Sequence, residues 1–397
     1  MPVLPTAQIY DVIIAGGGPA GSSSAIRLSL AGLNVLLIEK ADFPRHKLCG
    51  EFISPECLPY FAELGVLPDL YLAGAMRVER TAFYGRHGAK VEIPSDWLGN
   101  HGRAAIGLSR AAMDAALLDR AVAVGTRVMT ETTVKRVHRE QGGVAGVQFR
   151  DKSGTENEAR ANILLDATGR SRSLAQQVVQ ATPGKTPAKS VAFKAHLRGC
   201  RVAPGDCEIY AYRGGYGGCT SIEGDLANLC FIVPSADVKR LGSDPNRVMH
   251  EIVCTNRRAA TALVDAEMTG QWYAVPVARY GRFDLSPVTG LLAVGDSAGF
   301  IDPFTGSGML MALESAKIVS DVICNARDLG LDRSILAKDY AVRYSAKFDK
   351  RFRMSRILRV TTSVPYLDEM LISVLSKSEA ASRTLAMLTR INAGQDV

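Results

Sequence analysis

A glycine-rich turn near the N-terminus sharply limits the folds that this chain can adopt. Residues 9–15 form a short apolar run, which is typical of a strand buried on both faces of a parallel sheet. The run leads directly into the pattern Gly-x-Gly-x-x-Gly, at Gly16, Gly18 and Gly21. Gly16 permits a tight turn, Gly18 lets a pyrophosphate approach the backbone, and Gly21 allows a following helix to pack closely against the strand.

The residues after these glycines complete a β-α-β unit. Small residues up to about residue 31 predict a helix, and its first dipeptide, Pro19-Ala20, lies where backbone amides and the helix dipole attract a phosphate. A second apolar strand over residues 34–38 ends in Glu39, which can accept hydrogen bonds from a ribose. We therefore predict a dinucleotide site that includes Glu39 and the adjacent Lys40. The alternative is a glycine-rich turn that binds nothing.

Length and composition are those of a globular protein with two packing units. The chain has 397 residues, of which 47% are hydrophobic and 22% are charged. No apolar run reaches the length that spans a bilayer, and the N-terminus lacks the basic-then-apolar pattern of a signal peptide. The eight cysteines include no Cys-x-x-Cys pair and no zinc-type spacing, so we expect reduced thiols, no bound metal and a cytoplasmic protein.

The net charge of +7 comes largely from one late segment. Residues 338–359 contain eight Lys or Arg and two Asp. We interpret this segment as the solvated face of a helix, with contact to an anionic membrane surface or an acidic carrier as the alternatives. Nucleic acid is not an expected partner, because no stacking-aromatic or groove-reading motif accompanies the charge.

The order of predicted elements indicates an α/β fold with a long insertion. Alternating patterns and glycine turns favour a mainly antiparallel β substrate domain at 76–102 and 186–289. The remaining segments, 1–75, 103–185 and 290–345, form a discontinuous Rossmann-like dinucleotide-binding domain. We expect helices at 346–397, which either cap the substrate cavity or form a dimer face, and the oligomeric state is left open.

Three separated elements together carry a family resemblance. They are the glycine pattern with Glu39, the stretch Asp166-Ala-Thr-Gly169, and Gly295-Asp296 followed by Pro303 and by Gly306-Ser307-Gly308. In this order the chain resembles the glutathione-reductase-type FAD enzymes. Over about residues 9–325 it looks like the superfamily of flavoprotein monooxygenases, geranylgeranyl reductases and flavin-dependent halogenases.

The resemblance implies a role for each matching residue. The fingerprint glycines would hold the FAD pyrophosphate and Glu39 the adenosine ribose. Arg45 and Arg110 match arginines that reach the cofactor, and surface exposure is the alternative for Arg45. Asp296 would bind the ribityl chain, unless it only caps a helix. Amides at Gly306, Ser307 and Gly308 would stabilise the negative charge of a reduced flavin. The Asp166 to Gly169 turn completes the cofactor site.

The reaction is less well determined than the cofactor. Gly299 stands where aromatic hydroxylases usually have histidine, and the Asp166 turn replaces their Asp-Gly pair for nicotinamide. Residues 271–276 lack the halogenase Trp-x-Trp-x-Ile-Pro box. Cys49-Gly50-Glu51 resembles the Cys-Gly element of geranylgeranyl reductases, although their aromatic lining is degraded at residues 216–221.

We favour a monooxygenase that oxidises an aromatic or polyketide-like molecule in secondary metabolism, and we leave open whether this molecule is free or linked to a carrier or synthase. The alternative is a C=C reductase of an isoprenoid, followed by a halogenase and by a flavin-binding protein without turnover. NAD(P)H or a separate flavin reductase would donate electrons. Cys49 is the candidate catalytic residue, with a structural thiol as the alternative. Tyr210, Tyr212 and Tyr216 either line an aromatic substrate pocket or pack within the sheet.

Overall fold

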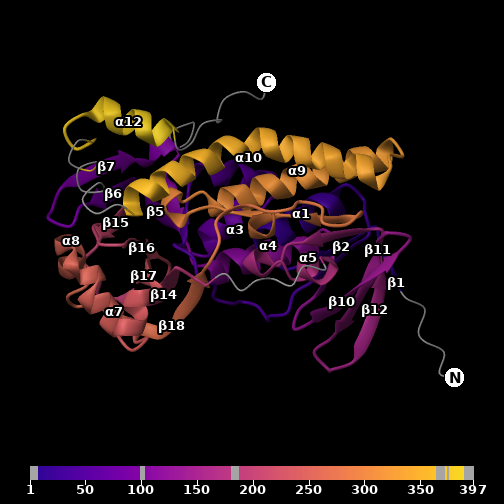
Figure 1. Ribbon diagram of the computed structural model, residues 1–397, viewed down its shortest axis with the longest axis horizontal. Helices are drawn as coiled ribbons and strands as arrows, with labels where there is room; N and C mark the ends of the chain where they lie inside the picture. Colours follow the sequence, from indigo (N-terminus) through magenta and orange to yellow (C-terminus); the bar gives the residue numbers. More distant parts are fainter. Residues whose placement is uncertain (1–7, 99–102, 180–186, 364–371, 373–374, 389–397) are drawn as a thin grey trace.

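The computed structural model describes residues 8–98, 103–179, 187–363, 372 and 375–388. It contains a parallel sheet covered by helices, a larger mixed sheet beside it, and a pair of long helices that run across the top of both in Figure 1. The predicted α/β fold with an inserted, mainly antiparallel sheet and C-terminal helices is confirmed. The predicted domain boundaries stay a prediction. Part of the segment 346–397 lies outside the described residues.

The parallel sheet carries the glycine turn. Its five strands have the order β20-β13-β2-β3-β9. They are β2 (Val12–Ala15), β3 (Val35–Ile38), β9 (Arg127–Met129), β13 (Ile163–Asp166) and β20 (Leu291–Ala293). Every residue of β2 and β3 is buried, because both faces of this sheet are covered, as the continuous apolar runs predict.

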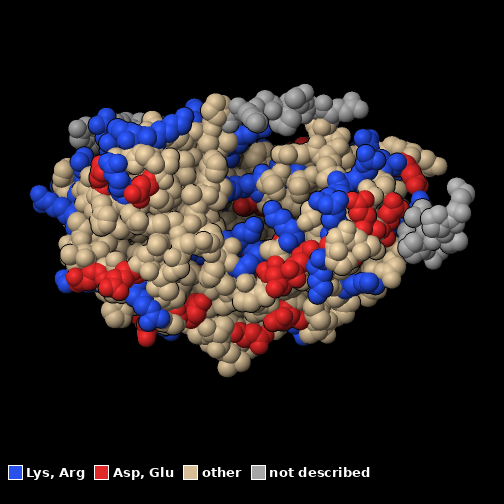
Figure 2. Space-filling view, turned by 90° about the horizontal axis from the view of Figure 1, so that it is seen from below, with Lys and Arg blue, Asp and Glu red and all other residues tan. Residues whose placement is uncertain are grey.

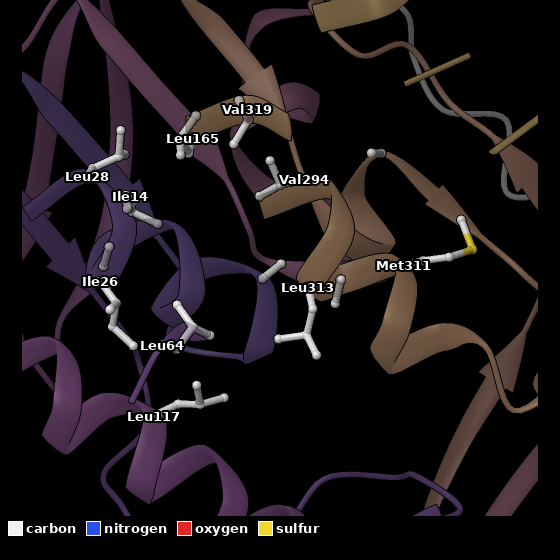
Figure 3. Packing of buried hydrophobic residues seen from close by; sticks show 14 of the residues in the cluster. Ile14, Ile26, Leu28, Leu64, Leu117, Leu165, Val294, Met311, Leu313 and Val319 are labelled. Atoms are coloured by element: carbon white, nitrogen blue, oxygen red, sulfur yellow. The ribbon is translucent and has the colours of Figure 1, made fainter. Parts of the chain in front are cut away.

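Alternate residues of the parallel strands pack against different layers. Ile14 and Leu165 face α1 (Pro19–Leu30), α4 (Arg110–Ala123) and α9 (Gly308–Asp328), as Figure 3 shows. Ile13 and Leu164 face a four-stranded sheet and α5 (Ser173–Val178). The four-stranded sheet consists of β1 (Gln8–Ile9), β10 (Thr133–Glu140), β11 (Gly143–Arg150) and β12 (Glu156–Arg160).

The seven-stranded sheet has the order β18-β14-β17-β16-β15-β6-β7, and all of its pairings except β15 with β6 are antiparallel. Its strands are β6 (Arg80–Tyr84), β7 (Lys90–Pro94), β14 (Ser190–Arg198), β15 (Asp206–Tyr212), β16 (Gly215–Ile222), β17 (Leu226–Pro234) and β18 (Glu267–Val277). One face packs against three short helices, α6 (Ser235–Arg240), α7 (Pro245–Glu251) and α8 (Arg257–Ala262). The other face is turned toward the parallel-sheet layer and its glycine turn.

The remaining elements connect these layers. They are α2 (Leu58–Glu63), α3 (Leu67–Leu72), α10 (Arg333–Ser363), α12 (Glu379–Leu388), β4 (Phe52–Ile53), β5 (Met76–Val78), β8 (Ala105–Gly107), β19 (Gly281–Arg282) and β21 (Gly299–Phe300). The basic segment 338–359 lies on α10 and is not wholly solvated, since Arg351 is buried and ion-paired with Glu56 at 3.0 Å. Among the described helices, none combines the length and the apolar character that crossing a membrane requires.

Candidate active site

A large cavity opens where the parallel strands end. Its volume is about 1310 Å³, and its wall includes the residues that end or follow β2, β3, β13 and β20. Open α/β sheets bind ligands at this edge. Basic side chains border the cavity, namely Lys40, Arg45, Lys47, Arg110, Arg170, Arg172 and Arg279. The face in Figure 2 is hollowed near its middle, with Lys and Arg side chains around the hollow.

The glycine turn is packed as tightly as the fingerprint predicts. A Cβ at Gly16 would lie 2.3 Å from the carbonyl oxygen of Ala167, and one at Gly21 would lie 1.8 Å from that of Gly16. Gly18 lies in the cavity wall with Pro19 and Ala20. Among the residues that the structure describes, no side chain caps the start of α1, so its first amides are available to an anion.

Glu39 lies at the end of β3 and is almost fully buried. Its carboxylate accepts hydrogen bonds from the backbone N–H of Gly17 at 2.8 Å and of Ala41 at 3.0 Å, and it pairs with Arg45 at 3.4 Å. Burial alone would raise the pKa of Glu39, but Arg45 and the two amides outweigh it and hold this pKa below its usual value. The ionised carboxylate and Lys40 both line the cavity.

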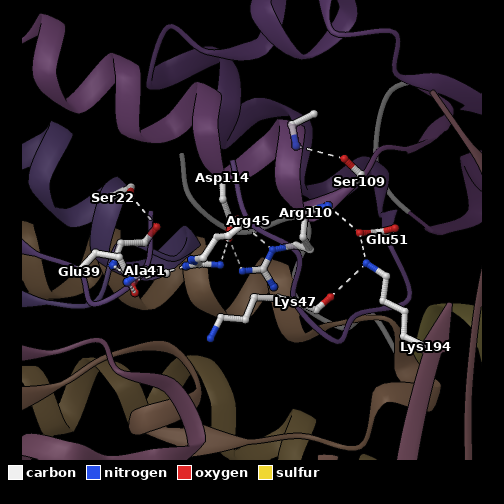
Figure 4. Close-up of polar contacts among 12 residues, drawn as sticks. Ser22, Glu39, Ala41, Arg45, Lys47, Glu51, Ser109, Arg110, Asp114 and Lys194 are labelled. Carbon is white, nitrogen blue, oxygen red and sulfur yellow. Dashed lines mark hydrogen bonds and ion pairs between the residues drawn. The ribbon is translucent and has the colours of Figure 1, made fainter. Parts of the chain in front are cut away.

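Two arginines share one buried acid beside the glycine turn (Figure 4). Arg45 Nη1 lies 2.9 Å from Asp114 Oδ2, and Arg110 contacts both oxygens of Asp114, at 2.9 and 2.6 Å. Asp114 raises the pKa of Arg110 although burial acts in the opposite direction. Both guanidinium groups lie close to Gly18, where a Cβ would meet them at 3.8 and 3.9 Å. Asp114 and Glu39 together balance the charges of these two arginines, and Lys40 and Lys47 in the same wall supply the excess positive charge where a pyrophosphate would bind. The sequence indicated the arginines but not Asp114.

Asp166 requires a correction. Its carboxylate is fully buried and is not part of the cavity wall. It accepts hydrogen bonds from the Thr168 backbone at 3.1 Å and hydroxyl at 2.6 Å, and from the Ala175 backbone at 2.9 Å. The side chain therefore holds the turn and the start of α5, and the predicted cofactor contact of Asp166 is wrong. Gly169 does line the cavity.

Asp296 faces the cavity with a carboxylate that the protein leaves available. Within the described residues no group donates a hydrogen bond to it, and burial raises its pKa against the opposing charges of Arg170 and Arg110. The helix-cap alternative is therefore not supported. Gly295, at φ +58°, lets this segment approach α1, since a Cβ there would lie 2.8 Å from Ala20 Cβ.

The start of α9 presents backbone to the cavity. Gly306 has φ +60°, and both Gly306 and Gly308 line the wall. Apart from its chain neighbours and the backbone of α9, no heavy atom of the described residues lies within 4 Å of a Cβ built on Gly308. Ser307 is buried and its side chain is not part of the wall, so only its backbone belongs to the turn. The Gly306 N–H already donates to the Pro303 carbonyl oxygen at 2.9 Å. The first amides of α1, the Gly308 backbone, the Asp296 carboxylate and the two arginines fit the phosphate, polyol and ring of FAD.

The other end of the cavity is largely apolar. Its aliphatic and aromatic lining residues come from β4, β6, β7, the 3-10 helix Ser95–Leu98, β15 and the C-terminal segment: Phe52, Phe83, Val91, Ile93, Leu98, Ile209, Ile372 and Leu375. Cys49 lies in the wall, and its Sγ accepts a hydrogen bond from the Glu51 backbone at 3.4 Å. Tyr216 also lines the cavity and donates to Asp302 at 2.6 Å.

Tyr210 and Tyr212 do not line the cavity, and their predicted substrate contact is wrong. Both are fully buried on the face of the sheet that packs against α7 and α8. Side chains alternate along a strand, so the cavity receives Ile209 and Ala211 from β15 instead. The sequence shows the alternation but not which face the helices cover.

A model of the FAD binding domain family matches residues 9–322. The chain belongs to this family. The match covers the glycine turn, Asp296 and the start of α9, so this protein is an FAD-dependent oxidoreductase.

Two curated relatives match most of the chain. One is conditioned medium factor receptor 1 of Dictyostelium discoideum, 28% identical over 88% of this chain and 70% of that protein. Another is the digeranylgeranylglycerophospholipid reductase of Methanosarcina mazei, 27% identical over 81% of this chain and 76% of the reductase. Among solved structures, the myxobacterial chondrochloren halogenase CndH has a TM-score of 0.80 at 21% identity, covering 98% of this chain and 92% of the halogenase. This last likeness shows the fold alone.

Proposed function

We propose that this FAD-dependent oxidoreductase reduces carbon–carbon double bonds in an isoprenoid chain. The sequence alone favoured a monooxygenase, and the apolar end of the cavity is the observation that moves the proposal to the reductase. Relatives named as digeranylgeranylglycerophospholipid reductases support the same choice, with identities of 27% and 28% for the two from Methanosarcina mazei and Methanosarcina acetivorans.

The lining residues support an isoprenoid substrate over an aromatic one. An isoprenoid chain gains about 0.8 kcal/mol for each CH₂ group that it buries against aliphatic walls such as Val91, Ile93 and Leu98. An aromatic or polyketide-like substrate carries hydroxyl and carbonyl groups, and burying these without hydrogen-bond partners costs free energy. Thr81 and Tyr84 of β6 also line the cavity, but Phe83, Val91 and Ile93 make most of the wall formed by β6 and β7 apolar, which favours a hydrocarbon.

FAD, when bound, supplies hydride transfer to the double bond. The chain's own contribution begins with binding: Gly18 and the start of α1 would hold the pyrophosphate, and Asp296 would accept from the ribityl hydroxyls. The Gly308 amide, at the start of α9, would stabilise negative charge on the reduced ring. Reduction also requires a proton at the second carbon, and we assign its donation to the Cys49 thiol in the cavity wall.

The direct test compares the products of an anaerobic reaction with an isoprenoid lipid and of an aerobic reaction with an aromatic substrate. Purified holoprotein is reduced with dithionite under anaerobic conditions and mixed with digeranylgeranylglycerophospholipid, and the lipid is analysed by mass spectrometry. A gain of two hydrogen atoms for each reduced double bond is the expected result. An unchanged lipid, together with incorporation of one oxygen atom into an aromatic substrate in the aerobic reaction, would assign the monooxygenase instead. Repeating the reaction with NAD(P)H, or with a separate flavin reductase, in place of dithionite identifies the electron donor.

The proposed role of Cys49 has its own test. Cys49→Ser should keep its FAD but lower the turnover number at least about tenfold, because a hydroxyl is a much weaker acid than a thiol. Cys254→Ser is the matched control, because Cys254 is also half-buried but does not line the cavity. Normal turnover by Cys49→Ser would leave Cys49 as a structural thiol.

A further inference from the structure

A buried ionic cluster of Glu51, Lys194 and His196 lies next to Cys49. Binding of the cofactor gives this cluster no role. We propose that Glu51 is a positioning residue, which fixes Cys49 in the cavity wall by binding Lys194 and His196 of β14. The consequence for turnover rests on the proposed function, whereas the structural consequence for Cys49 does not.

Lys194 is the unusual member of this cluster. It lies in an interior strand of the seven-stranded sheet, between Cys230 of β17 and Tyr273 of β18, and is fully buried. A buried ammonium group requires a partner, and Lys194 Nζ donates to the Glu51 carboxylate and, at 3.1 Å, to the carbonyl oxygen of Lys47. The lysine thus joins the sheet to both ends of the segment 47–51.

His196 completes the contact from the same face of β14. Its Nε2 lies 2.7 Å from Glu51 Oε2, and its ring meets that of His46 edge-on, with the ring centroids 5.2 Å apart. Burial alone would raise the pKa of Glu51, but the hydrogen bond from His196 and the charge of Lys194 hold this pKa below its usual value. Glu51 is therefore an anion with two partners in the sheet.

Glu51 also binds the opposite layer. Its Oε1 accepts the backbone N–H of Arg110, the first residue of α4, at 2.7 Å, as Figure 4 shows together with Lys194. A carboxylate is favourable at a helix N-terminus. One side chain thus connects β14, α4 and its own segment.

Cys49 is held by the same arrangement. The Glu51 backbone N–H donates to Cys49 Sγ, and Asn228 Nδ2 donates to the Cys49 carbonyl oxygen at 3.1 Å. Glu51 has φ +54°, a left-handed conformation that few non-glycine residues adopt. Such a backbone persists only when its surroundings determine it, and the bound carboxylate provides that restraint.

The segment between β3 and β4 has no helix or strand over residues 39–51. Arg45 holds its first half to Asp114 and Glu39, and the Glu51 cluster holds its second half. Without the Glu51 anion, Lys194 would keep only the Lys47 carbonyl among the described residues, and the Cys49 backbone only the hydrogen bond from Asn228, so this backbone could move away from the cavity.

The test measures the accessibility of Cys49 in the intact holoprotein. Iodoacetamide labelling of each cysteine is followed by mass spectrometry in the wild type, Glu51→Gln and the double variant Glu51→Gln/Lys194→Met. Cys49 should react at least about tenfold faster in both variants, while FAD content stays at the wild-type level. The double variant leaves no unpaired ammonium group, so it keeps the test decisive if Glu51→Gln does not fold.

The matched control is the ion pair between Glu208 and Arg258 on the opposite face of the same sheet. Arg258 Nη2 lies 2.6 Å from the buried Glu208 carboxylate, and neither residue lines the cavity. Glu208→Gln/Arg258→Met should lower stability without changing Cys49 labelling. In His196→Gln the glutamine amide can still donate to Glu51, so Cys49 should be labelled at nearly the wild-type rate.

Two results would overturn the proposal: unchanged Cys49 labelling in a folded Glu51 variant, or equal acceleration in the Glu208 control. With an active substrate, Glu51→Gln should lower kcat and leave KM unchanged within about twofold, because the substrate walls on β6 and β7 are unaffected. A wild type without turnover would disprove the proposed function, whereas the labelling comparison would still decide the role of Glu51.

Discussion

Two acids in the cavity wall show that environment decides what a carboxylate does. Glu39 receives two backbone hydrogen bonds and the charge of Arg45, and its pKa is lowered. Asp296 receives no hydrogen bond from the described residues, and burial raises its pKa. The chain therefore satisfies Glu39 by itself, while Asp296 retains its full capacity to accept hydrogen bonds from a ligand.

This contrast predicts opposite effects of one substitution on stability and binding. A raised pKa means that the ionised form of Asp296 destabilises the folded apoprotein at neutral pH. Asp296→Asn should therefore raise the urea midpoint of the apoprotein. It should also weaken FAD binding about tenfold or more, because a hydrogen bond to a charged group contributes about 1.5–3 kcal/mol.

Urea unfolding and fluorescence titration with FAD measure the two effects. Asp265→Asn, at an exposed residue paired with Arg201, is the control and should change neither quantity. Unchanged FAD affinity in Asp296→Asn would remove Asp296 from the cofactor site.

At the scale of elements, the helix starts fall into two kinds. In the described part of the chain, the N-cap residues of α1 and α9, Gly18 and Ser307, make no side-chain cap hydrogen bond to their own helix, and both helix starts contribute to the cavity wall. The start of α4 is capped instead, because Ser109 Oγ accepts a hydrogen bond from the Ala112 N–H at 3.1 Å and the Glu51 carboxylate accepts one from the Arg110 N–H. Uncapped helix starts leave the positive ends of their dipoles to a ligand.

Two glycines on these elements should respond differently to the same substitution. Gly308→Ala should leave the stability of the apoprotein within about 1 kcal/mol, because the added Cβ meets no heavy atom of the described residues within 4 Å outside its own helix turn. The methyl group would project into the cavity, so FAD affinity should fall about tenfold or more. Gly21→Ala should cost at least about 2 kcal/mol of stability, since its Cβ would lie 1.8 Å from the Gly16 carbonyl oxygen.

Thermal unfolding of the apoproteins and FAD titration distinguish these cases. FAD affinity equal to that of the wild type in Gly308→Ala would show that the start of α9 does not contact the cofactor.

The elements that the sequence predicted best are those whose residues are constrained locally. The glycine turn, the buried strands and Asp296 at a strand end follow from short patterns. Asp166 matched its motif, but its motif does not show which groups bind it. Only the folded turn shows that Thr168 and Ala175 donate hydrogen bonds to its two carboxylate oxygens. Lys194 and His196, two residues apart on an apolar strand, were a readable signal, but their partner Glu51 lies 143 residues before Lys194.

At the scale of the whole molecule, the cavity lies between two sheet layers that are distant in sequence. The parallel sheet and α9 supply the residues that fit the cofactor, and the seven-stranded sheet supplies the apolar wall. Glu51 contacts both layers through Arg110 and Lys194. The stability of the cavity should therefore depend on the charge of this one side chain.

A pH series tests that dependence. Because the pKa of Glu51 in the folded protein lies below the usual 4.5, its anion contributes stability above that pH. The contribution is lost as the pH falls through the folded-state pKa. The difference in unfolding free energy between the wild-type apoprotein and Glu51→Gln should thus be constant near neutral pH and should shrink below 4.5. Urea unfolding at each pH measures it.

The surface pair of Glu92 with Lys90 provides the comparison, because it is exposed and ion pairs of this kind contribute only about 0–1 kcal/mol. Glu92→Gln should therefore stay close to the wild type at every pH. If the difference for Glu51→Gln were instead unchanged far below pH 4.5, the stabilisation would come from hydrogen bonds that a neutral Glu51 also makes. If the difference grew as the pH fell, Glu51 would bind a proton more tightly in the folded state, and the cluster with Lys194 and His196 would not hold it as an anion.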